Sequence, residues 1–460
     1  MVPEKIIISH QKMSPSLNMI HVSRVAPSNS NSSESLTLPL TFFDLLWLKH
    51  KAVERVIFYK LTDVTRPFFE LVIVPNLKSS LSSSLSHYLP LAGQILWESL
   101  DPKPNIVYSP NDTVSFTVAE SNADFSRLTG KEPFSSTELH PLVPELQNSD
   151  DSASVMSFQV TLFPNQGFCI GVTAHHAVSD GKTTTTFLKS WAHLCKHQDS
   201  SLPEDLIPFY DRTVIKGPPE IDTKVLKIWH SIDKPKSLKL LPKPEIDSDV
   251  VRYTYELTRE DIEKLRERLK RESSSSSSLR LSTFVITFSY IFTCLIGSGG
   301  DDPDRPVGYR FAVDCRRLID DPPIPLTYFG NCVYSAVKIP LMAGLFLGEQ
   351  GFVAAARLIS DSVEELDSNV AWKIPELLET CENAPVESQF VSVAGSTRFG
   401  MYGLDFGWGK PFKSLLVSID QRGKISMAES RDGSGGVEIG FSLKKEEMNV
   451  LIDLLHKGIK

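Results

Sequence analysis

The segment that decides the fold reads SFQVTLFPNQGFCIGVTAHHAVSDG and spans residues 157–181. Two runs of apolar and β-branched residues flank a turn at residues 164–167, a pattern that predicts two strands. The second strand ends at the adjacent histidines His175 and His176. The stretch TTTTFLKSWAHLCKHQ that follows predicts a helix, with threonines available to cap its first turn. The sequence therefore predicts a strand pair and a helix joined by a loop that carries two histidines.

Strands and helices also alternate on both sides of this segment. ERVIFYKL, at residues 54–61, has the β-branched and aromatic content of a strand, and a similar stretch, VVRYTYEL, begins at Val250. EDIEKLRERLKRE, at residues 260–272, predicts a charged amphipathic helix, and the serine run at 273–278 predicts a solvated loop. A further apolar helix face is predicted by leucines at every fourth position: Leu77, Leu81, Leu85 and Leu89.

The length of the chain favours two domains. It has 460 residues, of which 41% are hydrophobic and 23% are charged, an ordinary composition for a globular protein. A single hydrophobic core stops growing at roughly 250–300 residues, so two cores suit this length better than one. Prolines punctuate the chain after the predicted helix and place a crossover linker at residues 206–245. We therefore expect an N-terminal domain at residues 1–205 and a C-terminal domain at residues 246–460.

Charge and hydropathy exclude several classes of partner. The net charge is −8, whereas proteins that bind nucleic acid normally carry a basic excess. The apolar runs are far shorter than the roughly 20 residues of a membrane span. The first twelve residues lack the apolar stretch of about 7–15 residues that a secretory signal needs. We expect a cytosolic protein with neither nucleic acid nor membrane among its partners.

The cysteines are scattered, without CxxC pairs and without the His/Cys clusters of a zinc site. Cysteines in apolar strands are usually packing residues. We therefore expect reduced, mostly buried thiols and no metal centre. The six residues are Cys169, Cys195, Cys294, Cys315, Cys332 and Cys381.

The first candidate for chemistry is the loop that begins at His176 and reaches Asp180 and Gly181. An HxxxD spacing is expected about 0.7 times by chance in a chain of this composition, so the spacing alone establishes nothing. An ordinary histidine pKa of about 6.5 nevertheless suits proton abstraction near neutral pH, and a carboxylate four residues on can brace the loop. A structural pair of histidines is the alternative interpretation.

The second candidate is DFGWG, formed by Asp405, Phe406, Gly407, Trp408 and Gly409. Glycines permit a tight backbone and the aromatic rings favour burial. The pattern is therefore more typical of a rigid structural turn than of a catalytic loop, with Asp405 as the one ambiguous group.

Together HHAVSDG and DFGWG resemble the motifs of the plant BAHD acyl-CoA-dependent acyltransferases. Further segments follow in the order of that family, so that the resemblance covers nearly the whole chain. They are LTLPLTFFDLLWL (36–48), HYLPLAGQI (87–95), QVTLFPNQG (159–167), IPFYDR (207–212), LSTFVITFSYIFTC (281–294), DCRR (314–317) and YFGNC (328–332).

The resemblance implies an α/β fold of two similar-sized, chloramphenicol acetyltransferase-like mixed-sheet domains with a central solvent channel. It assigns the general base to His176 and implies that Asp180 turns away from the substrate and pairs with Arg316. DFGWG lies away from the reacting atoms in the family, although Asp405 is sometimes given a catalytic label. No cofactor is held permanently, and an acyl-CoA is a co-substrate.

The resemblance also places CoA contacts at Ser282 and Thr283. Lys49, His50, Lys182, Arg280 and Arg398 are cations near family motifs that could meet CoA phosphates or a donor carboxylate. Arg398 is the leading candidate for the carboxylate. The alternative for each cation is an ordinary surface charge.

YFGNC and the residues around His176 resemble the sequences of the family branch that malonylates or aromatically acylates flavonoid and phenolic glucosides. The expected reaction moves malonyl from malonyl-CoA to the 6-hydroxyl of a flavonoid, anthocyanin or phenolic glucoside. One alternative is a transferase that uses a coumaroyl or caffeoyl donor. The other is a small-molecule binding protein without catalysis. A monomer is expected.

Overall fold

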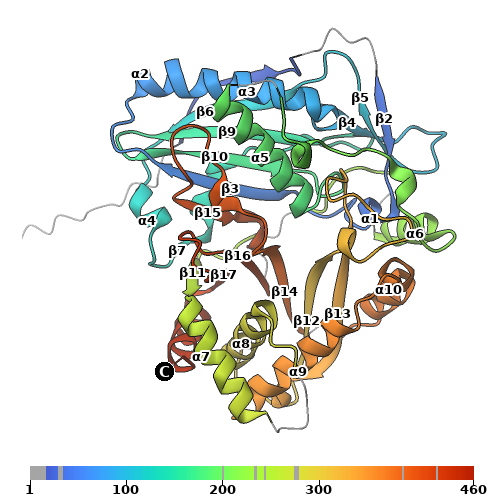
Figure 1. Ribbon diagram of the computed structural model, residues 1–460, viewed down its shortest axis with the longest axis vertical. Helices are drawn as coiled ribbons and strands as arrows, with labels where there is room; N and C mark the ends of the chain where they lie inside the picture. Colours follow the sequence, from blue (N-terminus) through green and yellow to red (C-terminus); the bar gives the residue numbers. More distant parts are fainter. Residues whose placement is uncertain are drawn as a thin grey trace, which may run out of the picture.

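The computed structural model describes residues 17–28, 35–198, 201–232, 236–242, 245–273, 279–385, 388–420 and 423–459. Two large sheets, each with its own helices, lie one above the other in Figure 1. The interpretation of the first twelve residues lies outside the described residues, and so does most of the serine run at 273–278.

The first sheet has six strands in the order β1-β6-β9-β10-β3-β15. At its centre lies the predicted strand pair, β9 and β10, in which every residue is buried. A continuous apolar run is typical of a strand that is covered on both faces. The strands are β1 (Leu17–Val25), β3 (Val53–Lys60), β6 (Val114–Ser121), β9 (Met156–Phe163), β10 (Gly167–Ala174) and β15 (Lys413–Leu416).

Figure 1 shows helix α3 (Val74–His87) along the top of this sheet and helix α5 (Gly181–His197) running diagonally across its strands. Of the predicted leucine face, Leu77, Leu81 and Leu85 are buried in α3, whereas Leu89 lies beyond the end of the helix and is partly buried. The prediction that threonines cap α5 is wrong. Asp180 is the N-cap, and its Oδ1 accepts a hydrogen bond of 2.8 Å from the Thr183 backbone N–H. A carboxylate is a good acceptor for the free N–H groups of a first turn, so the threonines lie within the helix.

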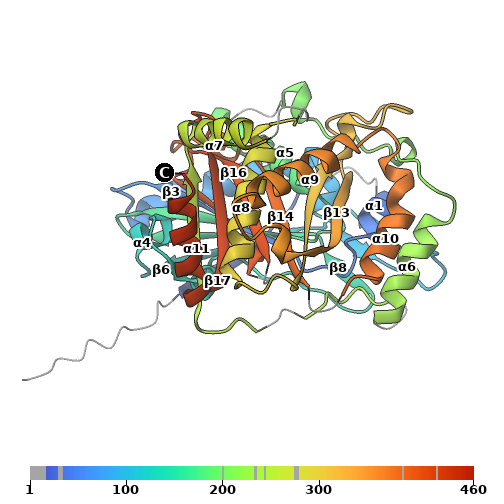
Figure 2. The same ribbon diagram turned by 90° about the horizontal axis from the view of Figure 1, so that it is seen from below.

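The second sheet has seven strands in the order β13-β12-β14-β16-β17-β11-β7. Figure 2 shows its helices packed over one face of the sheet. The strands are β7 (Phe134–Ser135), β11 (Val250–Leu257), β12 (Pro306–Asp314), β13 (Val333–Met342), β14 (Gln389–Ser396), β16 (Lys424–Glu429) and β17 (Val437–Lys444). The helices are α7 (Arg259–Glu272), α8 (Thr283–Ser298), α9 (Gly351–Glu364) and α11 (Lys445–Lys457).

A small third sheet and several short helices complete the described structure. The sheet runs β2-β5-β4-β8, formed by β2 (Leu36–Pro39), β5 (Asn105–Tyr108), β4 (Gln94–Leu96) and β8 (Ser152–Ser154). The remaining helices are α1 (Phe42–Leu45), α2 (Arg66–Phe68), α4 (Phe125–Thr129), α6 (Ile221–Ile232) and α10 (Ile374–Glu382).

The two halves of the chain exchange strands. β15, from the C-terminal half, pairs with β3 in the first sheet, and β7, from the N-terminal half, pairs with β11 in the second. The predicted linker at 206–245 contains α6, which packs against α1. The division into domains at 205 and 246 therefore stays a prediction, and the sheets interlock across it.

Two chemical features of the described residues agree with the sequence. All six cysteines have free thiols, and five of them are buried while Cys381 is exposed. In the described part of the chain, every helix is too short or too polar to cross a lipid bilayer.

Candidate active site

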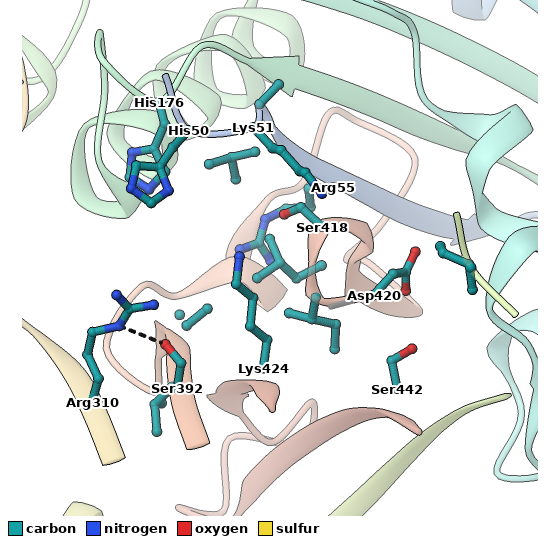
Figure 3. Close-up of a pocket in the computed structure, with 18 of the residues that line it drawn as sticks. His50, Lys51, Arg55, His176, Arg310, Ser392, Ser418, Asp420, Lys424 and Ser442 are labelled. Atoms are coloured by element: carbon teal, nitrogen blue, oxygen red, sulfur yellow. Dashed lines mark hydrogen bonds between the residues drawn. The ribbon is translucent and has the colours of Figure 1, made fainter. Parts of the chain in front are cut away.

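A cavity of about 1000 Å³ lies between the two sheets. One wall comes from the segment after α1, from β3 and from the loop after β10. The opposite wall comes from β12, β14, β16 and β17. Both halves of the chain therefore build the cavity, as Figure 3 shows. This is the place where the sequence predicted a central channel.

His176 lines this cavity, at the start of the loop that the sequence singled out. Its imidazole stacks on the indole of Trp47, with ring centroids 4.0 Å apart and an interplanar angle of 4°. His50 lies beside the same indole, at a centroid distance of 5.1 Å. The ring of His176 is therefore held by stacking while it borders the open space.

The surroundings of His176 favour its neutral form. Burial lowers the pKa of His176 to about 4, and Lys424 adds to this effect, whereas Asp180 and Asn331 act in the opposite direction. Burial also lowers the pKa of His50 to about 3, with His176, Arg310 and Lys424 adding to the decrease. A neutral imidazole can accept a proton near pH 7. The direction of this pKa shift therefore favours the unprotonated form that a general base needs.

His175 has a different environment. Its side chain is fully buried, and its Nδ1 accepts a 3.2 Å hydrogen bond from the Ala177 backbone N–H. It does not line the cavity. The side chains of the two adjacent histidines therefore separate, although both residues lie beyond the end of β10 at Ala174.

Asp180 forms the predicted ion pair with Arg316. An Arg316 terminal nitrogen lies 2.8 Å from Asp180 Oδ2, and the two side chains are 0% and 2% exposed. The same oxygen accepts a 3.0 Å bond from the Cys332 backbone N–H. Asp180 points into the protein and not into the cavity. Its position fits a group that fixes the loop and the start of α5.

The YFGNC segment connects this loop to the rest of the site. Asn331 donates through Nδ2 to the backbone oxygen of His176 at 2.8 Å. Its backbone N–H and its Nδ2 also donate to Asp44, at 2.8 Å and 3.0 Å. Arg316 donates to the backbone oxygens of Tyr328 and Gly330. The YFGNC and DCRR segments, which the sequence offers only as family motifs, therefore converge on the backbone that carries His176.

The DFGWG loop lies outside the cavity. Asp405 Oδ1 accepts hydrogen bonds from the Gly407 and Gly409 backbone N–H groups at 2.9 Å and 3.0 Å, and its Oδ2 lies 2.7 Å from Lys196 Nζ. Phe406 packs against Trp191, at 4.9 Å between ring centroids. The Asp405 carboxylate thus binds its own loop and Lys196 outside the cavity, which favours the structural interpretation over the catalytic label. Both interpretations stay predictions.

Most of the predicted cations do not reach the cavity. Lys49 is 1% exposed, and its Nζ donates to the Lys239 backbone oxygen at 3.2 Å, so it cannot meet a phosphate in solvent. Arg280 and Arg398 are exposed and lie outside the cavity lining, as does Lys182. Of the predicted cations, only His50 lines the cavity. Arg398 is therefore badly placed to hold a donor carboxylate.

Ser282 and Thr283 are exposed at the start of α8. The Ser282 hydroxyl caps this helix by accepting a bond from the Val285 backbone N–H at 3.2 Å. Neither residue lines the cavity, and their contact with CoA stays a prediction.

Sequence reasoning missed five cavity cations: Lys51, Arg55, Arg310, Lys424 and Lys444. Two signals were available in the sequence. Lys51 directly follows His50, and Arg310 precedes the DCRR segment by four residues in the same strand. Lys424 stands near no motif, and only the sheet topology brings it to the cavity.

Comparisons with known proteins agree with this geometry. A family model described as the Transferase family matches residues 16–454. The chain is 70% identical to phenolic glucoside malonyltransferase 1 of Arabidopsis thaliana, over 98% of this chain and 99% of the relative. It is 49% identical to malonyl-CoA:anthocyanidin 5-O-glucoside-6''-O-malonyltransferase of the same plant, over 96% and 98%. The crystal structure of vinorine synthase has the same fold, with a TM-score of 0.71, 21% identity and coverage of 96% and 98%.

Proposed function

The chain belongs to the Transferase family of BAHD acyltransferases and is an acyltransferase, and from this premise we propose that it moves malonyl from malonyl-CoA to the 6-hydroxyl of a phenolic glucoside. The relative that is 70% identical is named for malonyl transfer to such glucosides, which supports this choice of donor and acceptor. The observation that carries the proposal is the position of His176 on the wall of a cavity that also holds cations.

The proposed chemistry needs no covalent enzyme intermediate. His176 accepts the proton of the sugar hydroxyl as its oxygen attacks the thioester carbonyl of the donor. The tetrahedral intermediate then collapses, the carbon–sulfur bond breaks, and CoA leaves as a thiolate. The imidazolium of His176 returns the proton to that thiolate. The ester and free CoA are the products, and the base is restored.

The residues around His176 hold its loop in place. Asn331 binds the backbone oxygen of His176, and Asp180 anchors the far end of the loop to Arg316. Proton transfer requires the base to lie within hydrogen-bond reach of the hydroxyl, so an error in loop position reduces the rate. We assign Asp180, Arg316 and Asn331 positioning roles.

Composition supports two further parts of the proposal. The acidic net charge and the short apolar runs are consistent with a cytosolic enzyme, and no nucleic acid or membrane partner is proposed. The proposed working unit is a monomer, since the cavity is completed by the two halves of one chain.

A panel of donors and acceptors tests the proposal. The purified protein is incubated with malonyl-, acetyl- or coumaroyl-CoA and with phenolic, flavonoid or anthocyanidin glucosides, and the release of free thiol is followed. Mass spectrometry identifies the ester. We expect malonyl-CoA with a phenolic glucoside to give the highest kcat/KM. A higher kcat/KM with coumaroyl-CoA would replace the proposal with a hydroxycinnamoyl transferase.

A further inference from the structure

Three neighbouring strands place a row of polar side chains on the cavity wall. In the register of the second sheet, Arg310 on β12 pairs with Ser392 on β14, and Ser392 pairs with Lys424 on β16. Neighbouring strands lie about 4.8 Å apart, so the two cations stand on either side of the serine. Figure 3 shows the side chains of Arg310 and Lys424 directed from this wall toward His50 and His176.

Neither cation has an acidic partner among the residues that the structure describes. The Nε of Arg310 donates to Ser392 Oγ at 3.2 Å, and the guanidinium carbon lies 5.4 Å from the ring centroid of Phe390. For Lys424, no ion pair is found in the described part of the chain. Other charged groups of the cavity are paired: Asp420 binds Arg252, and Asp247 lies 3.0 Å from Lys444.

The positive charges in this row repel one another. Burial, together with the positive charges of Arg310 and Lys51, lowers the pKa of Lys424 to about 8. Burial also lowers the pKa of Arg310. Partly buried cations without a counter-charge destabilise a protein, whereas a bound anion offsets that cost. A bound anionic ligand would therefore neutralise the positive charge of this row.

The position of the row distinguishes between the anions of an acyl-CoA. The reacting thioester carbonyl must lie beside His176, because this histidine is the proposed base. In a malonyl group the free carboxylate is two bonds from that carbonyl, so it must lie in the same part of the cavity. The phosphates of CoA are separated from the carbonyl by the whole pantetheine arm. A cation directed toward His176 is therefore placed for the acyl carboxylate.

We propose that Arg310 and Lys424, with the Ser392 hydroxyl between them, bind the free carboxylate of the malonyl donor and select it over uncharged donors. This inference rests on the proposed function. A guanidinium can give a carboxylate two parallel hydrogen bonds, and the ammonium adds a compact second charge. The inference gives the malonyl carboxylate a site inside the cavity, in place of the exposed Arg398.

The test compares donors that differ only in the carboxylate. Arg310→Gln, Lys424→Gln and the double variant are assayed with malonyl-CoA and acetyl-CoA on the same glucoside. Removing one partner of a buried charge pair typically reduces affinity by about 30-fold or more. We expect kcat/KM for malonyl-CoA to fall by at least that factor in each single variant, and kcat/KM for acetyl-CoA to stay within about threefold.

Three controls keep the outcomes distinct. Lys338→Gln removes a surface cation that pairs with Glu365 outside the cavity, and both donors should respond to it within twofold. Arg310→Lys keeps the charge and should retain more malonyl-CoA activity than Arg310→Gln. Product inhibition by free CoA reports on phosphate binding and should not change in either glutamine variant. Thermal melts show that each variant is folded.

The remaining outcomes distinguish a failure of the inference from a failure of the proposed function. Equal losses with both donors, together with weaker inhibition by CoA, would assign the row to the CoA phosphates and overturn the inference, while leaving the proposed function intact. Unchanged use of malonyl-CoA by the double variant would overturn the inference as well. A wild-type enzyme that does not use malonyl-CoA would overturn the proposed function, and the inference with it.

Discussion

The loop that carries His176 and the DFGWG loop are both short sequence motifs with one aspartate, but the two aspartates lie in different environments. Each contains one aspartate that accepts backbone N–H groups and binds one cation. Asp180 is 2% exposed and its partner Arg316 is fully buried. Asp405 is 20% exposed and its partner Lys196 is 45% exposed. The first ion pair lies inside the protein behind the base, and the second lies at the surface.

The difference lies in what each loop holds in place. The first positions a base on the cavity wall. The second fastens the C-terminal half to the first sheet, through Phe406 packed on Trp191 and through a 2.8 Å bond from the Tyr59 hydroxyl to the Leu404 backbone oxygen. Gly407 and Gly409 have φ values of 106° and 94°, which side chains rarely tolerate. We therefore propose that DFGWG supports the fold and takes no part in the chemistry.

Replacing the base should give the largest effect and the sharpest separation of the two loops. His176→Ala is expected to lower kcat about 10²–10⁴-fold, the usual contribution of a general base. The melting temperature should change little, because the side chain borders a cavity. Thiol release and thermal melts on the same preparation measure both. A variant that keeps more than about a tenth of wild-type activity would remove His176 from the mechanism.

Removing Asp180 should damage stability and rate together. Asp180→Ala removes the buried partner of the Arg316 guanidinium and leaves it only the partly exposed Asp314, 2.9 Å away. Breaking a buried pair typically costs about 3–5 kcal/mol. Denaturant unfolding measures the free energy, and kcat is compared at a temperature where the variant is folded. An unchanged free energy of unfolding would contradict the structural role of the pair.

Truncating the aromatic ring of the DFGWG loop should affect stability alone. Phe406 is 1% exposed, and Phe→Ala changes in cores cost about 3–5 kcal/mol. Phe406→Ala should therefore unfold at a much lower denaturant concentration, while kcat and KM of the folded fraction stay near wild type. If kcat falls tenfold in fully folded protein, the contrast between the two loops is lost.

The smallest effect is expected at Asp405. Asp405→Asn removes the charge that meets Lys196 but keeps an oxygen that can accept the glycine N–H groups. Exposed ion pairs contribute about 0.2–1 kcal/mol, so stability should fall by no more than about 1 kcal/mol. Activity should not change. Steady-state kinetics that show a large loss of kcat would return Asp405 to the list of catalytic residues.

Local patterns in the sequence predicted part of this molecule. The hairpin β9–β10 and the leucine face of α3 follow from residue periodicity alone, and the pair of Asp180 and Arg316 followed from the family motifs. Asp180 and the threonines that follow it are all good N-cap residues, and the sequence alone does not show which of them caps α5. The exchange of β7 and β15 between sheets left no local signal.

The grouping of the cavity cations into one row could not be predicted for a related reason. Arg310, Ser392 and Lys424 are separated by long stretches of chain and become neighbours only through the parallel pairing of β12, β14 and β16. Such pairing depends on crossovers and register, which residue types near a motif do not specify. Proximity to a motif in the sequence therefore favoured Lys49 and Arg398, which the fold directs elsewhere.

The most direct test of His176 as a neutral base is the pH dependence of kcat/KM, which reports the ionisation of the free enzyme. Burial lowers the pKa of His176 to about 4, so the proton-accepting form prevails above that pH and is lost as the pH falls through it. We predict a flat profile from about pH 7 to pH 5, then a decline centred near pH 4, with tryptophan fluorescence confirming the fold at each pH. A decline centred at or above pH 6.5 would contradict the account, because the base would then be an ordinary solvated histidine.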